Sequence, residues 1–463
     1  MNIYKDKSKV KVNKVTNNII QNGVHAYSPE ENYLSPPSPV KEKLEEFKDM
    51  KLGFMVHWGL YSQLGLMASW GLVDAEAHWS RVKREYGDRL DWHQDGNKIR
   101  EEYFDLIHSF NPVRFNPDEW AELAKENGFK YLIFTTKHHD GFCLWDTKQT
   151  DFKVTAQDCP FSKHEKSDVV KHVFDAFREK DMAIGAYFSK PDWHCEDYWE
   201  SEVCKTIATT NMPTYDVKEN PEKWQAFTEY THKQLEELVR DYGKVDILWL
   251  DGGQVSKRNN LDIKLGEAVD KLREINPELI VVDRVARGAY EDYLTPEQKI
   301  PEKVITVPWE SCLTLGKDFN YIYDDDYKTP SELIELLLEI VCKGGNLALN
   351  VSPQPDGRMP RNAVKSITGL GDWLKKYGEA IYKTRPCAPY KDRDIFFTQT
   401  PECIYAISKG VEPAFIPCGQ KTYKVEFLNC GCEVAFEQTD NGIALDIKET
   451  TDEEYRVFKL YKV

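Results

Sequence analysis

The chain lacks the features that would place it in a membrane or on a nucleic acid. No window of its 463 residues approaches the roughly 18 uninterrupted apolar residues of a membrane-spanning helix. The N-terminal stretch has no apolar run of the roughly 7–15 residues that a secretory signal needs. Basic residues number 61 and acidic residues 77, and the resulting net charge of −16 disfavours a long basic surface for a polyanion. We therefore expect a cytoplasmic protein with no membrane or nucleic-acid partner.

Patterns that hold metals, nucleotides or redox disulfides are also missing. The sequence contains no H-E-x-x-H motif, no H-x-H at a strand end and no glycine-rich phosphate loop. The 11 cysteines are irregularly spaced, and the closest pair, Cys430-Gly-Cys432, matches neither a C-x-x-C redox motif nor a zinc ribbon. We expect buried free thiols and no metal or other cofactor.

Aromatic residues are abundant, at 12% of the chain, with 12 Trp, 24 Tyr and 21 Phe. Rings in this number either thicken a hydrophobic core or line pockets that stack on flat faces of ligands. Hydrophobic residues make up 41% and charged residues 30%, as in an ordinary globular protein. The composition therefore excludes a disordered chain and allows a large core.

Between residues 50 and 385, short apolar runs alternate with amphipathic stretches. The apolar runs cover residues 52–59, 130–142, 183–193, 245–253, 279–284, 304–310 and 346–353. Stretches with helical periodicity lie between them, at 117–129, 167–182, 221–243, 262–275 and 329–345. Nearly continuous apolar strands that alternate with helices are typical of parallel strands buried on both faces. We expect an α/β fold, a (β/α)8-like TIM barrel over residues 46–385, with one strand not assigned.

The sequence pattern changes on either side of this region. Residues 386–463 contain short alternating runs rich in Tyr, Phe, Val and Thr, separated by turns. Such period-2 alternation predicts a C-terminal antiparallel β-sandwich. Residues 1–45, with prolines at 36, 37 and 39, are expected to form an N-terminal arm.

Aromatic and titratable residues gather where the predicted strands end, which is the catalytic rim of a β/α barrel. They are His57, Trp58, His138, His139, Tyr187, Trp249, Asp251, Arg284, Trp309 and Glu310. Asp251 precedes two glycines, and Glu310 follows Trp309. Two carboxylates on one rim, beside aromatic rings, suit retaining glycoside hydrolysis, which needs a nucleophile and an acid/base about 5–5.5 Å apart. A structural role, with each carboxylate paired to a lysine or capping a helix, remains the alternative.

Several longer motifs resemble one family. The runs MVHWGLYSQLG, TTKHHDGFCLWDTKQTDF, GAYFSKPDWH, ILWLDGG, VPWESC and KGGNLALNVSPQPDG occur in order over residues 45–385 and are similar to those of glycoside hydrolase family 29, the retaining α-L-fucosidases. The resemblance implies a β/α barrel followed by a β-sandwich. It also implies exo-acting hydrolysis of terminal α-L-fucosyl residues by double displacement, with no cofactor and with fucosylated glycans as partners.

The resemblance assigns roles to individual residues. It implies that Asp251 is the nucleophile and Glu310 the acid/base. It also implies substrate-binding roles for the remaining candidates, which are His57, Trp58, Trp70, His138, His139, Tyr187, Trp249 and Arg284.

The chain departs from the family pattern in three places. Ser69 stands where many members have glutamate, Phe188 replaces a tyrosine, and GKDFNY follows the W-E pair in place of a Ser-Trp/Phe-Gly-Tyr run. Three other functions stay open at this point: a non-catalytic fucose-binding barrel, a member of the same family that also accepts α-L-galactosides, and a metal-dependent barrel hydrolase.

Overall fold

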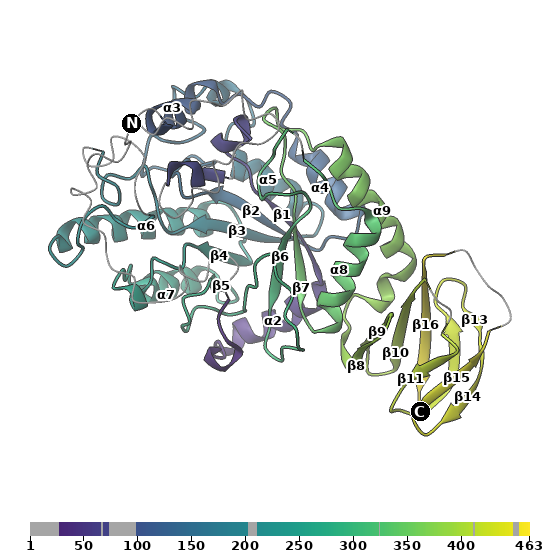
Figure 1. Ribbon diagram of the computed structural model, residues 1–463. Coiled ribbons are helices and arrows are strands. Elements are labelled where there is room, and N and C mark those ends of the chain that lie inside the picture. The colour runs from purple at the N-terminus through teal and green to yellow at the C-terminus, as the bar shows by residue number, and fades with distance from the viewer. Residues whose placement is uncertain are drawn as a thin grey trace, which may run out of the picture.

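The fold is built around one curled sheet of seven parallel strands (Figure 1). The computed structural model describes residues 27–65, 68–73, 99–201, 211–323, 325–410, 413–447 and 453–463. The strands are β1 (Leu52–Val56), β2 (Tyr131–Lys137), β3 (Ala183–Ser189), β4 (Ile247–Asp251), β5 (Ile280–Asp283), β6 (Glu310–Thr314) and β7 (Asn346–Asn350). They lie in the order β5-β4-β3-β2-β1-β7-β6. Six of the seven predicted strands are confirmed in position.

Amphipathic helices cover the outside of this sheet. They are α4 (Pro117–Glu126), α5 (Val169–Arg178), α6 (Pro221–Asp241), α7 (Leu265–Ile275), α8 (Pro330–Cys342) and α9 (Arg361–Tyr377), with α3 (Ile99–Asp105) at the periphery. All residues of β1, β2, β6 and β7 are buried. Burial on both faces explains their continuous apolar sequences.

The barrel has seven strands in the described residues, so the expected eighth strand is a wrong prediction. An irregular segment, residues 290–298, occupies the gap between β5 and β6. It first runs beside β5, where the Asp292 N–H donates to the Val281 carbonyl at 2.9 Å. It then runs beside β6, where the Gln298 N–H donates to the Cys312 carbonyl at 3.0 Å. The segment thus closes the barrel without forming a regular strand.

The sixth strand lies further along the chain than predicted. The expected run was 304–310, but Pro308 has no N–H to donate to a ladder, and β6 begins only at Glu310. Glu310 is paired in register with Asn346, the first residue of β7. Because parallel strands share one direction, Glu310 lies at the N-terminal end of the barrel, opposite the end where Asp251 completes β4.

Helix α2 (Ser38–Met50) closes this N-terminal end of the barrel (Figure 1). Its apolar face consists of Val40, Leu44 and Phe47. The ring of Phe47 stacks on Tyr293 with centroids 4.6 Å apart and contacts Tyr131 at 5.3 Å. The start of the expected N-terminal arm, residues 1–26, lies outside the described residues, and residues 27–37 lead into α2.

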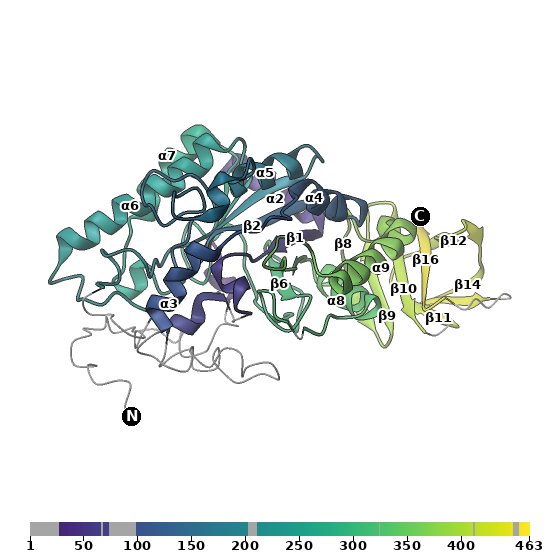
Figure 2. The ribbon, with the colours of Figure 1, turned by 90° about the horizontal axis from the view of Figure 1, so that it is seen from above.

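The C-terminal strands form two antiparallel sheets, as predicted (Figure 2). They are β8 (Arg385–Asp392), β9 (Ile395–Gln399), β10 (Cys403–Lys409), β11 (Phe415–Pro417), β12 (Thr422–Phe427), β13 (Cys432–Glu433), β14 (Ala435–Thr439), β15 (Gly442–Asp446) and β16 (Tyr455–Lys462). One sheet has the order β13-β12-β16-β10-β9-β8 and the other β11-β15-β14. The strands β8 and β9 pack beside α8, so this unit adjoins the barrel wall.

Most cysteines in the described part of the chain are free thiols, but one pair is bonded. Among the described residues, eight cysteines are free, and seven of these are buried. Cys430 and Cys432 form a disulfide instead, so the expectation of free thiols is wrong for this pair. The turn at Gly431, with φ +66°, brings their Cα atoms to 5.2 Å, within the range that a disulfide spans.

Among the described residues, no helix has the length and apolar character needed to cross a membrane.

Candidate active site

Asp251 occupies the C-terminal end of β4, and its side chain remains 18% exposed. Its carboxylate accepts hydrogen bonds from Arg284 Nη1 and from the Tyr187 hydroxyl, both at 2.6 Å. Burial raises the pKa of Asp251, but Arg284, the nearby His139 and the Tyr187 hydroxyl outweigh burial and hold the pKa well below its usual range. Asp251 is therefore ionised at neutral pH.

The glycine after Asp251 allows the chain to turn sharply at this point. Gly252 has φ +85°, and a Cβ atom there would lie 2.2 Å from the ring of Pro191. Both the backbone angle and the close approach require glycine. The loop after β3 can therefore pack against Asp251, where the Lys190 N–H donates to the Asp251 carbonyl at 3.0 Å.

A second carboxylate, that of Glu297, lies beside Asp251 and shares its arginine. Arg284 binds Asp251 through Nη1 and Glu297 through Nη2. The Glu297 side chain is 12% exposed. One planar guanidinium thus joins the two carboxylates, an arrangement compatible with the separation of about 5–5.5 Å used in retaining glycoside hydrolysis.

Glu310 lies below this site inside the barrel, and the structure corrects its expected place at the mouth. It is 0% exposed. Its carboxyl group accepts hydrogen bonds from the Tyr131 hydroxyl at 2.7 Å, Trp249 Nε1 at 3.1 Å and the Tyr293 hydroxyl at 3.2 Å. The physical reason is the later start of β6, which puts Glu310 at the opposite end of the strands.

Burial makes the ionised form of Glu310 unfavourable in the folded protein. Burial raises its pKa from 4.5 to about 7, although three hydrogen bonds oppose the shift. A carboxyl group with a raised folded-state pKa binds a proton on folding, so stability falls as the pH rises from about 4.5 to about 7.

We expect Glu310→Gln to remove this pH dependence. The difference in unfolding free energy between variant and parent should shift by about 3 kcal/mol in favour of the variant between about pH 4.5 and pH 7.5. Urea unfolding followed by tryptophan fluorescence at several pH values measures it. Parallel stability profiles for the two proteins would contradict the buried, protonated state of Glu310.

Tyr187 and Trp249 form the layer between Asp251 and Glu310. Their rings stack with centroids 5.2 Å apart, and the Arg284 guanidinium lies 4.6 Å from the Trp249 ring centroid. Side chains two residues apart on a strand share a face, so Trp249 and Asp251 both point into the barrel. Trp249 therefore supports the floor beneath Asp251 and Arg284.

His57 follows β1 and offers one ring nitrogen to the site. Its Nδ1 lies 2.7 Å from Asn350 Oδ1. The Asn350 amide is oriented by its own donation to the Phe319 carbonyl at 2.6 Å, so Nδ1 of His57 carries the proton. Burial lowers the pKa of His57 to about 4. The imidazole is therefore neutral, and Nε2 can accept a hydrogen bond from a ligand hydroxyl.

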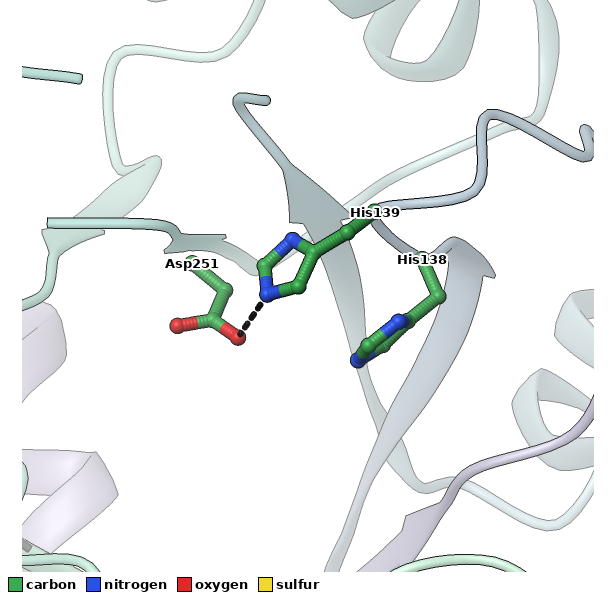
Figure 3. Close-up of side chains that lie close together, drawn as sticks. All are labelled: His138, His139 and Asp251. Carbon is green, nitrogen blue, oxygen red and sulfur yellow. Dashed lines mark ion pairs between the residues drawn. The ribbon is translucent and has the colours of Figure 1, made fainter. Parts of the chain in front are cut away.

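Both adjacent histidines after β2 turn toward Asp251 (Figure 3). On a strand they would face opposite sides, but β2 ends at Lys137, so the pair lies outside strand geometry. His139 Nε2 lies 3.8 Å from Asp251 Oδ2, and His138 Nδ1 bonds Ser69 Oγ. Within the described residues, the buried Nδ1 of His139 has no hydrogen-bond partner. Burial lowers the pKa of both rings.

The two remaining tryptophans differ in place. Trp70, on the turn Ala68–Leu72, contacts His139 with ring centroids 5.1 Å apart, as expected for a residue near the site. Trp58 is 1% exposed and packs outside the barrel against Phe115 and Trp120. The structure thus corrects the expected place of Trp58 at the mouth, because neighbouring side chains alternate and His57 already faces inward.

Sequence reasoning missed Glu297 because no motif marks it. It lies in YLTPEQKIPEK, between Pro296 and Pro301, with neither strand nor helix periodicity. One signal was available: residues 285–303 contain no predicted element, and the barrel lacked one strand. An acidic residue in that gap was therefore a candidate, although the gap also contains Glu291, Asp292 and Glu302.

Paired carboxylates at the C-terminal end of a β/α barrel, surrounded by aromatic rings, are the arrangement of a glycoside hydrolase site. Residues 20–379 match the family model described as alpha-L-fucosidase. Because this match covers more than half of the sequence, the chain belongs to the α-L-fucosidase family.

Individual relatives agree with this assignment. The human plasma alpha-L-fucosidase is 27% identical over 382 residues, covering 78% of this chain and 75% of the relative. The alpha-L-fucosidase of Dictyostelium discoideum is 26% identical, covering 88% and 89% of the two chains.

Solved structures share the fold. A Bacteroides thetaiotaomicron family 29 α-L-fucosidase, trapped as a covalent intermediate with 2-fluoro-fucosyl fluoride, has a TM-score of 0.74 and 25% identity, covering 92% of this chain and 97% of that chain. A Thermotoga maritima α-fucosidase in complex with fucose has a TM-score of 0.70 and 27% identity, covering 91% and 99% of the two chains.

Proposed function

We propose that the protein is an exo-acting retaining α-L-fucosidase in which Asp251 is the nucleophile and Glu297, rather than Glu310, is the acid/base. The observation that carries this proposal is the Arg284 bridge between two partly exposed carboxylates. The family supplies the substrate class, and a related structure is a covalent intermediate of the kind that retention requires.

In the first step, Asp251 attacks the anomeric carbon while Glu297, which enters the step as the protonated acid, gives its proton to the departing glycosidic oxygen and becomes a carboxylate. The Arg284 bond and the Tyr187 hydroxyl keep Asp251 ionised and orient it for attack. In the second step, Glu297 removes a proton from water, which attacks the same carbon and releases the sugar. Two inversions return the original α configuration.

The histidines supply the polar lining for the sugar. His57 is neutral and accepts through Nε2, whereas His139 presents its Nε2 beside Asp251 (Figure 3). Trp70 adds an apolar surface beside His139. Fucose combines hydroxyl groups with one methyl group, so a lining of neutral imidazoles and aromatic rings matches both parts. Terminal α-L-fucosyl groups of fucosylated glycans are the proposed substrates.

A metal-dependent reaction is a weaker candidate for the same residues. Ligand atoms of His138, His139 and Asp251 lie within 4.8 Å of one another, the spacing of a possible metal site. Arg284 already supplies a positive charge at 2.6 Å from Asp251, which would repel a cation there. His138 Nδ1 is also engaged by Ser69. We therefore propose hydrolysis without a metal.

The configuration of the first product tests the mechanism. With an aryl α-L-fucoside, proton NMR should show α-L-fucose before mutarotation, because two displacements restore the starting configuration. Transfer of the sugar to methanol should likewise give methyl α-L-fucoside. First release of β-L-fucose would indicate a single displacement, and no release would leave a binding protein as the remaining function.

A further inference from the structure

The chain between β5 and β6 carries two groups of the proposed active site without a helix or strand to support them. Arg284 comes directly after β5, Glu297 lies near the middle, and β6 begins at Glu310. All residues from 284 to 309 are described, and they form no regular element. In other β/α units, a helix packed on the sheet holds this connection. Other contacts must therefore fix Arg284 and Glu297.

Backbone strain is concentrated directly after Arg284. Val285 has φ +61° and Arg287 has φ +54°, a region that a β-branched residue such as valine rarely adopts. The carboxylate of Glu291 accepts hydrogen bonds from the backbone N–H groups of both residues, at 3.1 and 3.0 Å. Glu291 is 3% exposed. It thus holds the strained turn that sets the direction of Arg284.

Residues that precede α2 in the sequence contact the Glu291 carboxylate and the chain around it. Ser28, which is 1% exposed, donates from Oγ to Glu291 Oε2 at 2.6 Å, across 263 positions of sequence. The Tyr33 hydroxyl donates to the Asp292 carbonyl at 3.1 Å. Glu30 Oε1 accepts from the Thr306 N–H at 2.9 Å.

These three bonds join residues 27–33, named here the N-terminal strap, to the connection between β5 and β6. They reach it at Glu291, at Asp292 and at Thr306, so they hold it on both sides of Glu297. Helix α2, which follows the strap, is itself packed into the barrel through Phe47. The strap is therefore anchored to the barrel at its far end as well.

We propose that the N-terminal strap and Glu291 position Arg284 and Glu297 for proton transfer to the leaving group. Ser28 and Glu291 are positioning residues, because they act on the irregular backbone that carries Arg284 and Glu297. Asp251 is held separately, by β4 and by the Tyr187 hydroxyl, so the effect falls mainly on Glu297. This inference rests on the proposed acid role of Glu297. Its specific consequence is that loosening the strap weakens protonation of the leaving group.

Three variants of the full chain loosen the strap in different ways. Ser28→Ala removes the hydroxyl bonded to Glu291, Tyr33→Phe removes the bond to Asp292 with little change in shape, and Glu291→Gln leaves one backbone N–H without its acceptor. Ser38→Ala is the matched control, since its hydroxyl bonds only the exposed Glu42 on α2. A second substitution at this position, Ser28→Thr, keeps a hydroxyl group, so its activity should exceed that of Ser28→Ala and approach that of the parent.

The measurement compares aryl α-L-fucosides with good and poor leaving groups. Two proteins are compared with the parent: the Glu291→Gln variant, and the double variant that combines Ser28→Ala with Tyr33→Phe. For both, we expect kcat/KM to fall about 10- to 100-fold with the poor leaving group and at most about threefold with the good leaving group. A merely structural role would reduce the active fraction and so lower both values equally. Equal losses, or no loss in any variant, would overturn the proposal.

Glu297→Gln, measured in the same assay, distinguishes the acid role of Glu297 from the positioning role of the strap. If this variant shows no dependence on the leaving group, the acid role is wrong and the strap's function is wrong with it. If Glu297→Gln shows the dependence and the strap variants do not, the acid role stands and the strap has no part in positioning.

Discussion

Replacing Asp251 with glycine is expected to abolish turnover of α-L-fucosides while leaving the fold intact. The variant removes the proposed nucleophile, and losses on the order of 10⁴-fold or more in kcat follow such a removal. The glycine leaves space beside Arg284, which still carries its positive charge and remains paired with Glu297. Added azide should enter this space and attack an activated fucosyl fluoride or aryl fucoside.

The anomeric configuration of the azide product shows whether Asp251 is the residue that attacks the sugar. Azide that replaces Asp251 attacks once, so the expected product is β-L-fucosyl azide, detected by NMR. Tyr187→Phe is the control: it removes one hydrogen bond to Asp251 but keeps the nucleophile, so it should lower activity modestly and show no azide rescue. Near-normal turnover of Asp251→Gly, or rescue that yields the α-azide, would be incompatible with a nucleophilic Asp251.

The second large effect is expected for Glu297→Gln. With a poor leaving group, kcat/KM should fall about 10²- to 10⁴-fold, because the departing oxygen is no longer protonated. With a good leaving group the first step needs no acid, so the loss should be much smaller. Azide should then attack the glycosyl-enzyme and give α-L-fucosyl azide, the opposite anomer from that of Asp251→Gly.

Glu310→Gln is the matched control for this experiment. It is the same substitution at the residue that sequence motifs favour, but Glu310 is fully buried and bonded by Tyr131, Trp249 and Tyr293. We expect both kinds of substrate to be hydrolysed within about tenfold of the parent rate, since a buried group cannot reach the leaving oxygen. A leaving-group effect at position 310 and none at 297 would reverse the assignment.

Local sequence patterns were sufficient to predict most strands and helices of the barrel. The runs around Phe54, Ile133 and Leu248 are apolar over their whole length because these strands are covered on both faces. The helices between them have apolar stripes that match their buried faces, as in α5 and α9. Period-2 alternation likewise predicted the C-terminal sheets, although β9 and β10 are buried at consecutive positions and so are covered on both faces.

Prediction failed where the chain follows no period. The apolar run Val304-Ile305-Thr306-Val307 predicts a strand that begins six residues before β6, but Pro308 interrupts this run. The motif predicts that Trp58 lies at the site with His57, yet neighbouring side chains on an extended chain point to opposite sides. His138 and His139 show the converse, since both turn inward once β2 has ended.

The sequence by itself determined the fold class, the family and the position of Asp251, because periodicity and motifs are properties of short stretches of chain. Only the tertiary structure decided which carboxylate accompanies Asp251. Glu310 follows a tryptophan in a recognisable motif but lies at the closed end of the barrel, whereas Glu297 lies in an irregular segment that meets Arg284. The distance of a carboxylate from the reacting carbon depends on strand register and on contacts between residues far apart in sequence, such as Ser28 and Glu291. No local pattern encodes such contacts.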